Sequence, residues 1–187
     1  MATDVLVERN ALSDLNPIEV PGRLRVVPAE DCARFTLRVA DAGRRDAGAA
    51  FGCPIPARIG DFEQREGRLA LCVGPDEWFL LAPIVEAQKI VDGFRQVVTP
   101  HSLVDVSHRE VGIDVSGPSA SVALNSGSAL DLSNMSPASS TRTIFDKAPI
   151  VLVKHSDDQY RIEVWQSFAT HVWELLAAAS REIALGI

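Results

Sequence analysis

The chain has 187 residues, of which 47% are hydrophobic and 23% charged, a composition typical of one globular domain or of two small halves that share a core. Its 18 basic and 25 acidic residues give a formal net charge of −7 without any concentrated basic stretch, which argues against binding to a nucleic-acid backbone. The sequence contains neither an apolar run of transmembrane length nor a secretory signal at its start, so we expect a cytoplasmic protein that does not enter the membrane.

The first half of the chain begins with an arm and continues as alternating strand-like and helix-like segments. Residues 1–22 combine prolines, a glycine and scattered apolar residues without a sustained period, which predicts an extended arm that packs on a neighbour or frays. Alternation over residues 35–39 predicts a strand, and an Ala-rich stretch over residues 41–52 predicts a short helix. A hairpin around the turn sequence GPDE is expected over residues 69–81, and a longer helix over residues 84–98.

The same order of elements returns in the second half. Residues 111–115 alternate as a strand does, and residues 117–127 begin with Gly-Pro and end at a glycine, as a short helix does. A second hairpin is predicted over residues 151–164, followed by a helix over residues 168–183.

This repetition divides the chain after the arm into two units, residues 23–100 and residues 101–187. We expect one α+β domain with pseudo-twofold symmetry, made of duplicated strand-helix-hairpin-helix units whose helices pack on a shared, mainly antiparallel sheet. Residues 78–81 are apolar on both faces of their strand, so this hairpin must be covered on both sides by its own helices or by a partner. In the second hairpin, Arg161 and Glu163 share a face opposite the apolar residues.

The four histidines do not predict a metal site. His101, His108, His155 and His171 show neither HxH nor HExxH spacing. We single out His108, because it follows a strand-like stretch and precedes Arg109 where a loop can present both.

Other catalytic patterns are equally weak. A triad of Asp105, Ser107 and His108 is discounted because adjacent residues of a strand point to opposite faces. The turn over residues 116–119 lacks both phosphate-loop patterns and is better explained as a helix start, although a helix N-terminus there can attract an anion. The cysteines are odd in number, have no CxxC spacing and predict neither a disulfide framework nor a zinc site: Cys32, Cys53 and Cys72.

Two arginines and one tryptophan are candidates for contact with another subunit. Arg109 and Arg142 can each hold a carboxylate through two hydrogen bonds, although an exposed arginine on a strand is the commoner case. Trp173 lies at the edge of the apolar face of the last helix, where it either closes the rim of the core or contacts a partner. We take His108, Arg109, Arg142 and Trp173 as candidate subunit-contact residues, and expect Trp173→Ala to weaken assembly more than it destabilises the isolated chain.

Several segments resemble known families. The stretch DVSH, followed by VGI and SGP within residues 105–118, looks like the folate-dependent aminomethyltransferases of the glycine cleavage type. A fuller resemblance, over roughly residues 23–180, is to the gamma subunit of heterotetrameric sarcosine oxidase. It rests on GPDEWFLL, DVSHREVGIDVSGPSA, LNSGSALDLS, TRTIF, KAPIVLV and YRIEVWQSFATHVWELL.

The resemblance implies a small subunit without a cofactor of its own, whose fold is related to the folate-binding region of aminomethyltransferases. Such a subunit assembles with alpha, beta and delta chains into an enzyme that oxidises sarcosine to glycine, forms hydrogen peroxide and passes a one-carbon unit to tetrahydrofolate. FAD, FMN and NAD belong to the larger subunits, zinc to the delta subunit, and folate to the alpha chain. The resemblance implies no catalytic residue here, and Asp131 remains a weak candidate for contact with a polar ligand.

Three hypotheses follow from these observations. The first is a non-catalytic structural subunit of sarcosine oxidase. The second is a free-standing, folate-dependent aminomethyltransferase-like one-carbon protein, and the third is a duplicated interaction domain with some other partner.

Overall fold

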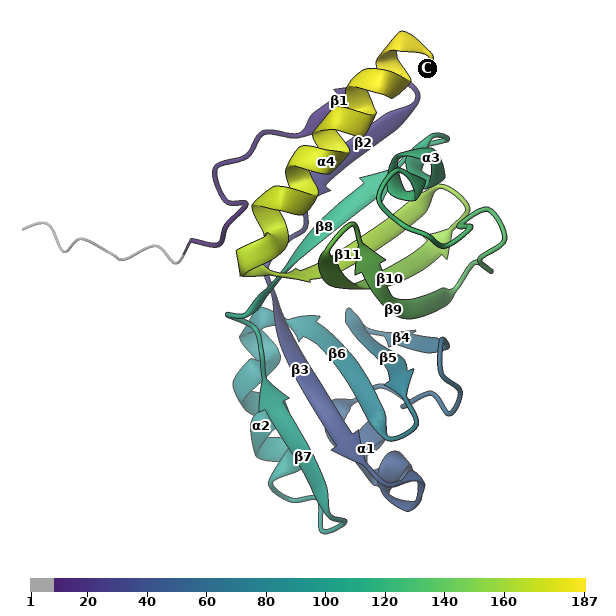
Figure 1. Cartoon of the computed structure of the whole chain (residues 1–187). Coiled ribbons are helices and arrows are strands. Elements are labelled where there is room, and N and C mark those ends of the chain that lie inside the picture. Colours follow the sequence, from purple (N-terminus) through teal and green to yellow (C-terminus); the bar gives the residue numbers. More distant parts are fainter. Residues whose placement is uncertain (1–8) are drawn as a thin grey trace, which may run out of the picture.

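Residues 9–187, which the computed structural model describes, form two antiparallel sheets that pack against each other with helices on their outer sides (Figure 1). Residues 1–8 of the predicted arm lie outside the described residues. The upper sheet in Figure 1 has six strands in the order β1-β2-β8-β11-β10-β9, and the lower sheet has five in the order β4-β5-β6-β3-β7. We call them the six-stranded sheet and the five-stranded sheet.

The strands of the six-stranded sheet are β1 (Ile18–Val20), β2 (Leu24–Pro28), β8 (Glu110–Ser116), β9 (Ser139–Phe145), β10 (Ala148–Ser156) and β11 (Gln159–Trp165). Those of the five-stranded sheet are β3 (Cys32–Val39), β4 (Phe62–Arg65), β5 (Arg68–Gly74), β6 (Glu77–Pro83) and β7 (His101–Asp105). The helices are α1 (Arg44–Phe51), α2 (Ala87–Phe94), α3 (Ala120–Asn125) and α4 (Gln166–Leu185), with 3₁₀ turns η1 (Asp41–Gly43) and η2 (Ile84–Glu86) before α1 and α2.

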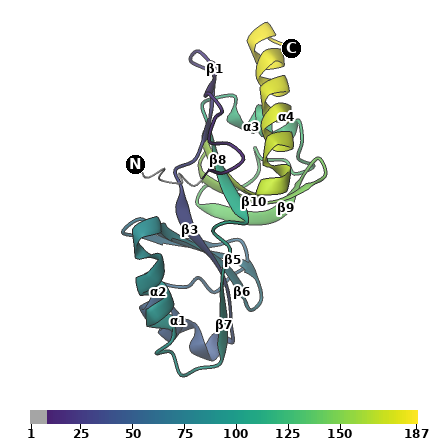
Figure 2. The ribbon, with the colours of Figure 1, turned by 90° about the vertical axis from the view of Figure 1, so that its left-hand side faces the viewer.

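The helices are divided evenly between the two sheets. α1 and α2 cover the outer face of the five-stranded sheet, and α3 and α4 cover that of the six-stranded sheet (Figure 2). None of the helices within residues 9–187 has the length and hydrophobicity needed to span a bilayer.

The predicted elements occur in the predicted order, as β3, α1, β5–β6 and α2, and again as β8, α3, β10–β11 and α4. The longer helix expected over residues 84–98 is wrong: α2 has eight residues, as α1 does, and follows the 3₁₀ turn η2. In each repeat one further strand, β4 or β9, precedes the hairpin. The expectation of one shared sheet is wrong, because both hairpins carry apolar side chains on two faces. One face of each packs on helices and the other packs on the opposite sheet, so the hairpins meet between two separate sheets.

The two predicted units, residues 23–100 and residues 101–187, exchange their first strands. β2 pairs with β8 in the six-stranded sheet, whereas β7 pairs with β3 in the five-stranded sheet. The chain therefore crosses from one sheet to the other between β2 and β3, and again between β7 and β8 over residues 106–109. Neither sheet is built from one unit alone.

The first hairpin, β5–β6, is covered on both faces by the chain itself. Trp78 and Leu80 pack with α1 and α2 on the outer side. Phe79 and Leu81 point the other way and join a cluster between the sheets that includes Val151 of β10. The helices α1 and α2 cover one face of the hairpin, as predicted. The other face is covered by the six-stranded sheet of the same chain and not by a partner.

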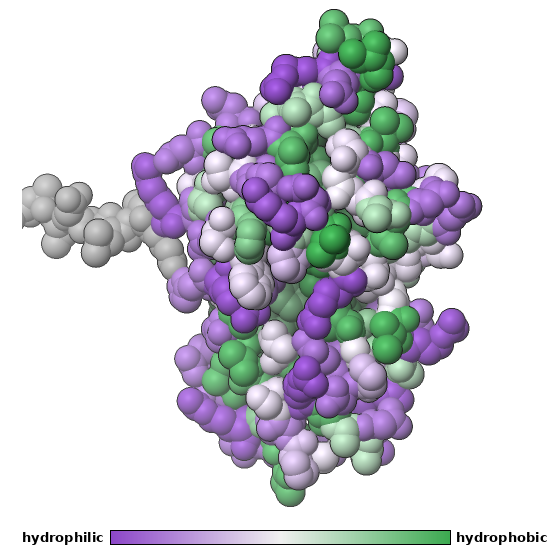
Figure 3. All heavy atoms as spheres, viewed as in Figure 1, coloured by the Kyte–Doolittle hydropathy of each residue, from purple (hydrophilic) through white to green (hydrophobic). Residues whose placement is uncertain are grey.

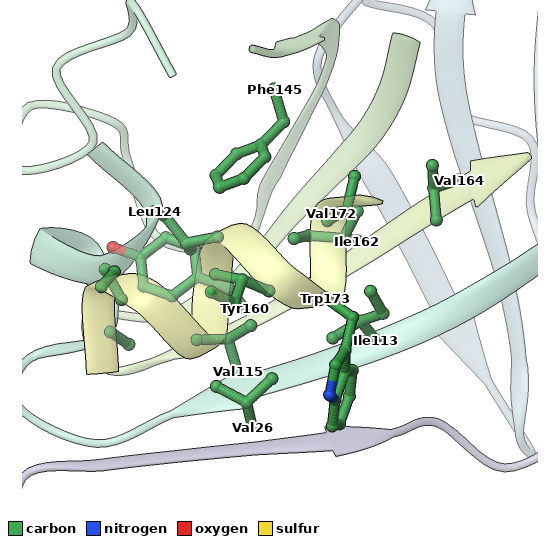
Figure 4. Packing of buried hydrophobic residues seen from close by; sticks show 14 of the residues in the cluster. Val26, Ile113, Val115, Leu124, Phe145, Tyr160, Ile162, Val164, Val172 and Trp173 are labelled. Carbon is green, nitrogen blue, oxygen red and sulfur yellow. The ribbon is translucent and has the colours of Figure 1, made fainter. Parts of the chain in front are cut away.

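The described part of the N-terminal arm packs on the six-stranded sheet. β1 pairs with β2, and Leu12 and Val20 are buried in the same core as α4. Figure 4 shows this core, in which the Trp173 indole extends from α4 toward Val26 of β2 and Ile113 of β8. The arm therefore adds a strand and core side chains to its own chain.

Gly117 fixes the turn that precedes α3. Its φ is +111°, and a Cβ there would lie 2.5 Å from the carbonyl oxygen of Arg23, so an L side chain does not fit. The Ser119 N–H donates to the same carbonyl over 2.9 Å. α3 begins at Ala120, later than the Gly-Pro pair suggested, because the turn is used to join β2 to the helix.

Candidate functional site

A cleft of about 430 Å³ opens between the two sheets. We call it the inter-sheet cleft. It is lined by side chains of β3, β6 and β7 on one side and of β9, β10 and β11 on the other. Its charged lining residues are Arg38, Glu77, Arg109, Glu110, Arg142 and Glu163.

Strand alternation explains why polar groups line this cleft. Along β11, Tyr160, Ile162 and Val164 are buried in the core under α4. Glu163 and Trp165 have the opposite parity, so they point toward the five-stranded sheet and line the cleft. The sequence predicts that Arg161 and Glu163 share this face of the strand, and in the structure Glu163 lines the inter-sheet cleft.

Glu77 joins the two sheets at the cleft. One of its carboxylate oxygens accepts a hydrogen bond from Arg142 Nη2 of β9 at 2.5 Å, and the other accepts one from Arg38 Nη2 of β3 at 2.8 Å. The hydrogen bond from Arg142 holds the pKa of Glu77 below its usual range. Arg142 therefore binds a carboxylate of the same chain, through one hydrogen bond rather than the two that its side chain can make.

A second carboxylate, Glu163, is buried between two arginines. Arg34 Nε donates to one of its oxygens and Arg161 Nε to the other, each over 2.6 Å. Arg34 and Glu163 are 2% and 1% exposed, so this ion pair lies in the interior. Arg161 also lies 3.7 Å from Asp114, whose pKa burial raises.

The third charged group consists of Arg109, Glu110 and Trp165. Arg109 Nη2 donates to Glu110 Oε1 over 2.7 Å, and its guanidinium lies 5.4 Å from the centroid of the Trp165 ring, within cation–π range. Glu110 is buried, and burial raises its pKa although the hydrogen bond from Arg109 acts in the opposite direction. Arg109 thus bridges a buried carboxylate and an exposed aromatic ring.

The start of α4 holds the turn that carries His108 and Arg109. The Gln166 N–H donates to the carbonyl oxygen of Arg109 over 2.9 Å, and Gln166 Nε2 donates to that of His108 over 2.8 Å. Both side chains are exposed in this crossing between the sheets. These two hydrogen bonds from Gln166 fix the backbone of His108 and Arg109, and so fix the position from which the Arg109 side chain extends.

The structure brings together only some of the residues that the sequence singled out. Arg109 and Arg142 line the same cleft, and His108 lies beside Arg109 in the sequence. Trp173 does not reach this surface, because it is 6% exposed and lies in the core between α4 and β2 (Figure 4). Its assignment as a subunit-contact residue is corrected: in this chain Trp173 is a core residue.

Asp131 lies in an exposed loop away from the cleft. Its oxygens accept hydrogen bonds from Ser133 Oγ at 2.5 Å and from Asn134 Nδ2 at 2.6 Å, and the bond from Ser133 lowers the pKa of Asp131. These contacts are local to the loop, so the contact with a polar ligand suggested for Asp131 stays a prediction.

The remaining polar candidates are engaged in local contacts. Ser107 Oγ donates to Asp105 Oδ1 over 2.6 Å, which uses both groups to shape the crossing between the sheets. Burial is the main reason that the pKa of each cysteine thiol is raised. Within residues 9–187, no three His, Cys, Asp or Glu side chains gather as they would around a metal ion.

Sequence reasoning missed Trp165 and Glu77. Trp165 is 43% exposed at the end of β11, and its parity with Glu163 was a signal that it faces the cleft. Glu77 was assigned to a turn, and its link to Arg142 joins residues 65 positions apart, for which a single sequence carries no local sign.

Comparison with known proteins places this geometry in a family. The family described as "Sarcosine oxidase, gamma subunit family" matches residues 44–182. By structure, the chain is similar to a chain of the heterotetrameric sarcosine oxidase from Corynebacterium sp. U-96, solved in complex with pyrrole 2-carboxylate. The TM-score is 0.84 at 21% identity, covering 95% of this chain and 96% of that chain. No curated protein matches by sequence.

A second similarity is to the glycine cleavage system aminomethyltransferase T from Bartonella henselae, with a TM-score of 0.65 at 12% identity. The match covers 83% of this chain and 46% of that chain, so the chain spans less than half of the aminomethyltransferase. Both likenesses confirm the predicted fold class. Together with the family match, they favour the gamma-subunit interpretation over a free-standing aminomethyltransferase.

Proposed function

Because the chain belongs to the sarcosine oxidase gamma subunit family, we propose that it is a non-catalytic subunit of a multi-chain sarcosine oxidase. It assembles with alpha, beta and delta chains and supports the oxidative demethylation of sarcosine to glycine. FAD, FMN, NAD, tetrahydrofolate and zinc are held by the other chains. The family match over residues 44–182 carries the proposal.

The pairing of charges in the inter-sheet cleft supports a binding role rather than a chemical one. Glu77 and Glu163 each accept hydrogen bonds from two arginines, and Glu110 accepts one from Arg109. A general base needs a carboxylate free to take a proton near neutral pH. The hydrogen bond from Arg142 lowers the pKa of Glu77, which disfavours this role for Glu77. Burial raises the pKa of Glu110, but its carboxylate is held by Arg109.

In this proposal, the mouth of the inter-sheet cleft contacts a partner chain. Val104 and Trp165 line the cleft and are 51% and 43% exposed, and the lining arginines Arg109 and Arg142 are exposed as well. Ile144, which is 53% exposed, pairs across β9 and β10 with the lining residue Pro149. Arginine and aromatic side chains are enriched at protein interfaces. Figure 3 shows hydrophilic and hydrophobic residues mixed over this face of the molecule, including the level at which the two sheets meet.

Co-expression with the alpha, beta and delta chains of the same organism tests the proposal. A tag on this chain should retain the other three, together with the visible absorbance of their flavins. Trp165→Ala combined with Ile144→Ser should weaken retention by about tenfold, since interface aromatics contribute most of the binding energy. Arg95→Ala, a change at an exposed arginine paired with Asp92 outside the cleft, is the matched control.

Retention of all three chains by the double variant at wild-type strength would place the contact elsewhere. Failure of the wild-type chain to retain any of them would favour an interaction domain with another partner. Titration of the isolated chain with tetrahydrofolate should give no saturable heat, and binding in the micromolar range would instead support the one-carbon alternative.

A further inference from the structure

A second cavity, of about 720 Å³, lies on the outer side of the five-stranded sheet and is lined by four arginines. It shares no lining residue with the inter-sheet cleft. Its walls are α1 with the preceding 3₁₀ turn, the segment over residues 52–55, and the turn between β4 and β5. Its arginines are Arg44, Arg45, Arg65 and Arg68. We call it the arginine pocket.

Arginine side chains are concentrated around this pocket. The chain has 18 basic residues, and four of them line this one cavity. Each of the four has a carboxylate partner: Asp41 for Arg44, Asp46 for Arg45, Glu66 for Arg65 and Glu86 for Arg68. The charges around the pocket therefore balance, and an anion that binds there takes over guanidinium donors from these carboxylates.

Arg68 supplies the observation that points to a ligand. It is 9% exposed, and its Nε is buried without a hydrogen-bond partner among the described residues. Its Nη2 lies 2.7 Å from Glu86 Oε2, an ion-pair contact that does not involve Nε, and Glu86 Oε2 is itself buried without a hydrogen-bond partner among the described residues. A buried donor left without an acceptor is costly, and an oxyanion in the pocket would satisfy it.

The other three arginines keep donors for such an anion. Arg44 Nε lies 3.1 Å from Asp41, and Arg45 and Arg65 lie 3.4 Å and 3.7 Å from the acidic residues that follow them in the chain. Each guanidinium has five N–H groups, and exposed ion pairs of this kind contribute little. A multivalent anion can therefore recruit these side chains at small cost.

Small residues on one side of α1 open the cavity. Gly48 and Gly52 both line it, and a Cβ on Gly52 would lie 2.2 Å from Arg68 Nη1. Gly52 also has a φ of +78°, which suits the residue that ends a helix. Glycine at this position therefore leaves room for the Arg68 guanidinium beside the pocket.

We propose that the arginine pocket binds a small multivalent oxyanion through phosphate or carboxylate groups. Its volume falls within the range of small-molecule sites, and guanidinium groups recognise both chemistries through paired hydrogen bonds. The proposal is independent of the contact proposed for the inter-sheet cleft.

Calorimetric titration of the full chain with pyrophosphate and with citrate, at ionic strength matched with sodium chloride, tests the site. Saturable binding of pyrophosphate alone assigns phosphate, and binding of citrate alone assigns carboxylate. Arg68→Lys keeps the charge but loses Nε as a donor and should weaken binding by about tenfold, as expected for a hydrogen bond to a charged group. Arg65→Gln, at an exposed position, should weaken it without a loss of stability. Arg58→Gln, an exposed arginine outside the pocket, should leave binding unchanged.

Three results would overturn the proposal. The first is the absence of saturable heat with either anion, and the second is wild-type affinity in Arg65→Gln and Arg68→Lys alike. The third is loss of anion binding when the chain is assembled with the oxidase chains, since the pocket would then accept an acidic segment of a partner.

Discussion

Replacing Glu163 with glutamine removes the negative charge that Arg34 and Arg161 share between the sheets. The substitution keeps the shape of the side chain. It leaves the Arg34 guanidinium, which is 2% exposed, without a countercharge at the 2.6 Å contact. Arg161 retains Asp114 at 3.7 Å, so the larger part of the penalty falls on Arg34.

Removing one partner of a buried ion pair costs about 3–5 kcal/mol. For a chain of this length, each kcal/mol lowers the melting temperature by about 2–4 °C, so a fall of roughly 6–20 °C is expected. Glu19→Gln is the matched control, because Glu19 pairs with Arg25 at 3.1 Å on the surface and such pairs contribute about 1 kcal/mol or less.

Urea unfolding at neutral pH measures both variants. Glu163→Gln should shift the midpoint strongly with an unchanged dependence on denaturant. Arg34→Met combined with Glu163→Leu should recover part of the loss, because the Arg34 charge is no longer buried without a partner and Arg161 keeps Asp114. A loss for Glu163→Gln no larger than that of Glu19→Gln would refute the reasoning, since the pair would then behave as a solvated one.

Three further changes are open to the same measurement. Trp173→Ala should lower the free energy of unfolding by about 3–5 kcal/mol, because it truncates a core aromatic side chain. Wild-type stability in this variant would contradict the assignment of Trp173 to the core. The folded pKa of Glu77 lies below its ordinary value of 4.5, so its stabilisation is present above that value and is lost as the pH falls through the folded pKa. Glu77→Gln should therefore destabilise the chain at neutral pH and converge with wild type in acid, whereas a constant difference would contradict this. Gly117→Ala should cost about 1–3 kcal/mol, because its Cβ would meet the Arg23 carbonyl, and more than Gly22→Ala, where no atom lies within 4 Å.

The order of elements could be predicted from the sequence because local rules determine it. Alternation identifies β3, β8 and β11, and proline and glycine positions bound the short helices. The assignment of strands to sheets could not be predicted in this way. β2 and β7 join the sheet of the other unit, and this exchange depends on contacts between distant residues.

Trp173 shows how a missing strand misleads a helical wheel. The wheel places its indole at the edge of the face that α4 buries, which is correct if α4 covers a flat sheet. β1 and β2 extend that sheet, and Leu12, Val20 and Val26 join the same core. The edge of the helix face is therefore buried by β2 and by the N-terminal arm, which was expected to pack on a neighbour or to fray.

The inter-sheet cleft was predictable only in part. The chemistry of arginine singled out Arg109 and Arg142, and both line the cleft. Their partners differ in predictability: Glu110 is adjacent to Arg109 in the sequence, whereas Glu77 is distant from Arg142. A site assembled from two sheets becomes visible once the sheets are placed against each other.

The central claim is tested most directly by omitting this chain from a four-chain co-expression. The mass of the purified complex and the rate of sarcosine-dependent hydrogen peroxide formation are then compared with those of the complete complex. We predict that, without this chain, the alpha, beta and delta chains do not purify as one complete three-chain complex and that oxidase activity is lost. Adding the purified chain should restore both. A complete three-chain complex with undiminished activity would contradict a supporting role.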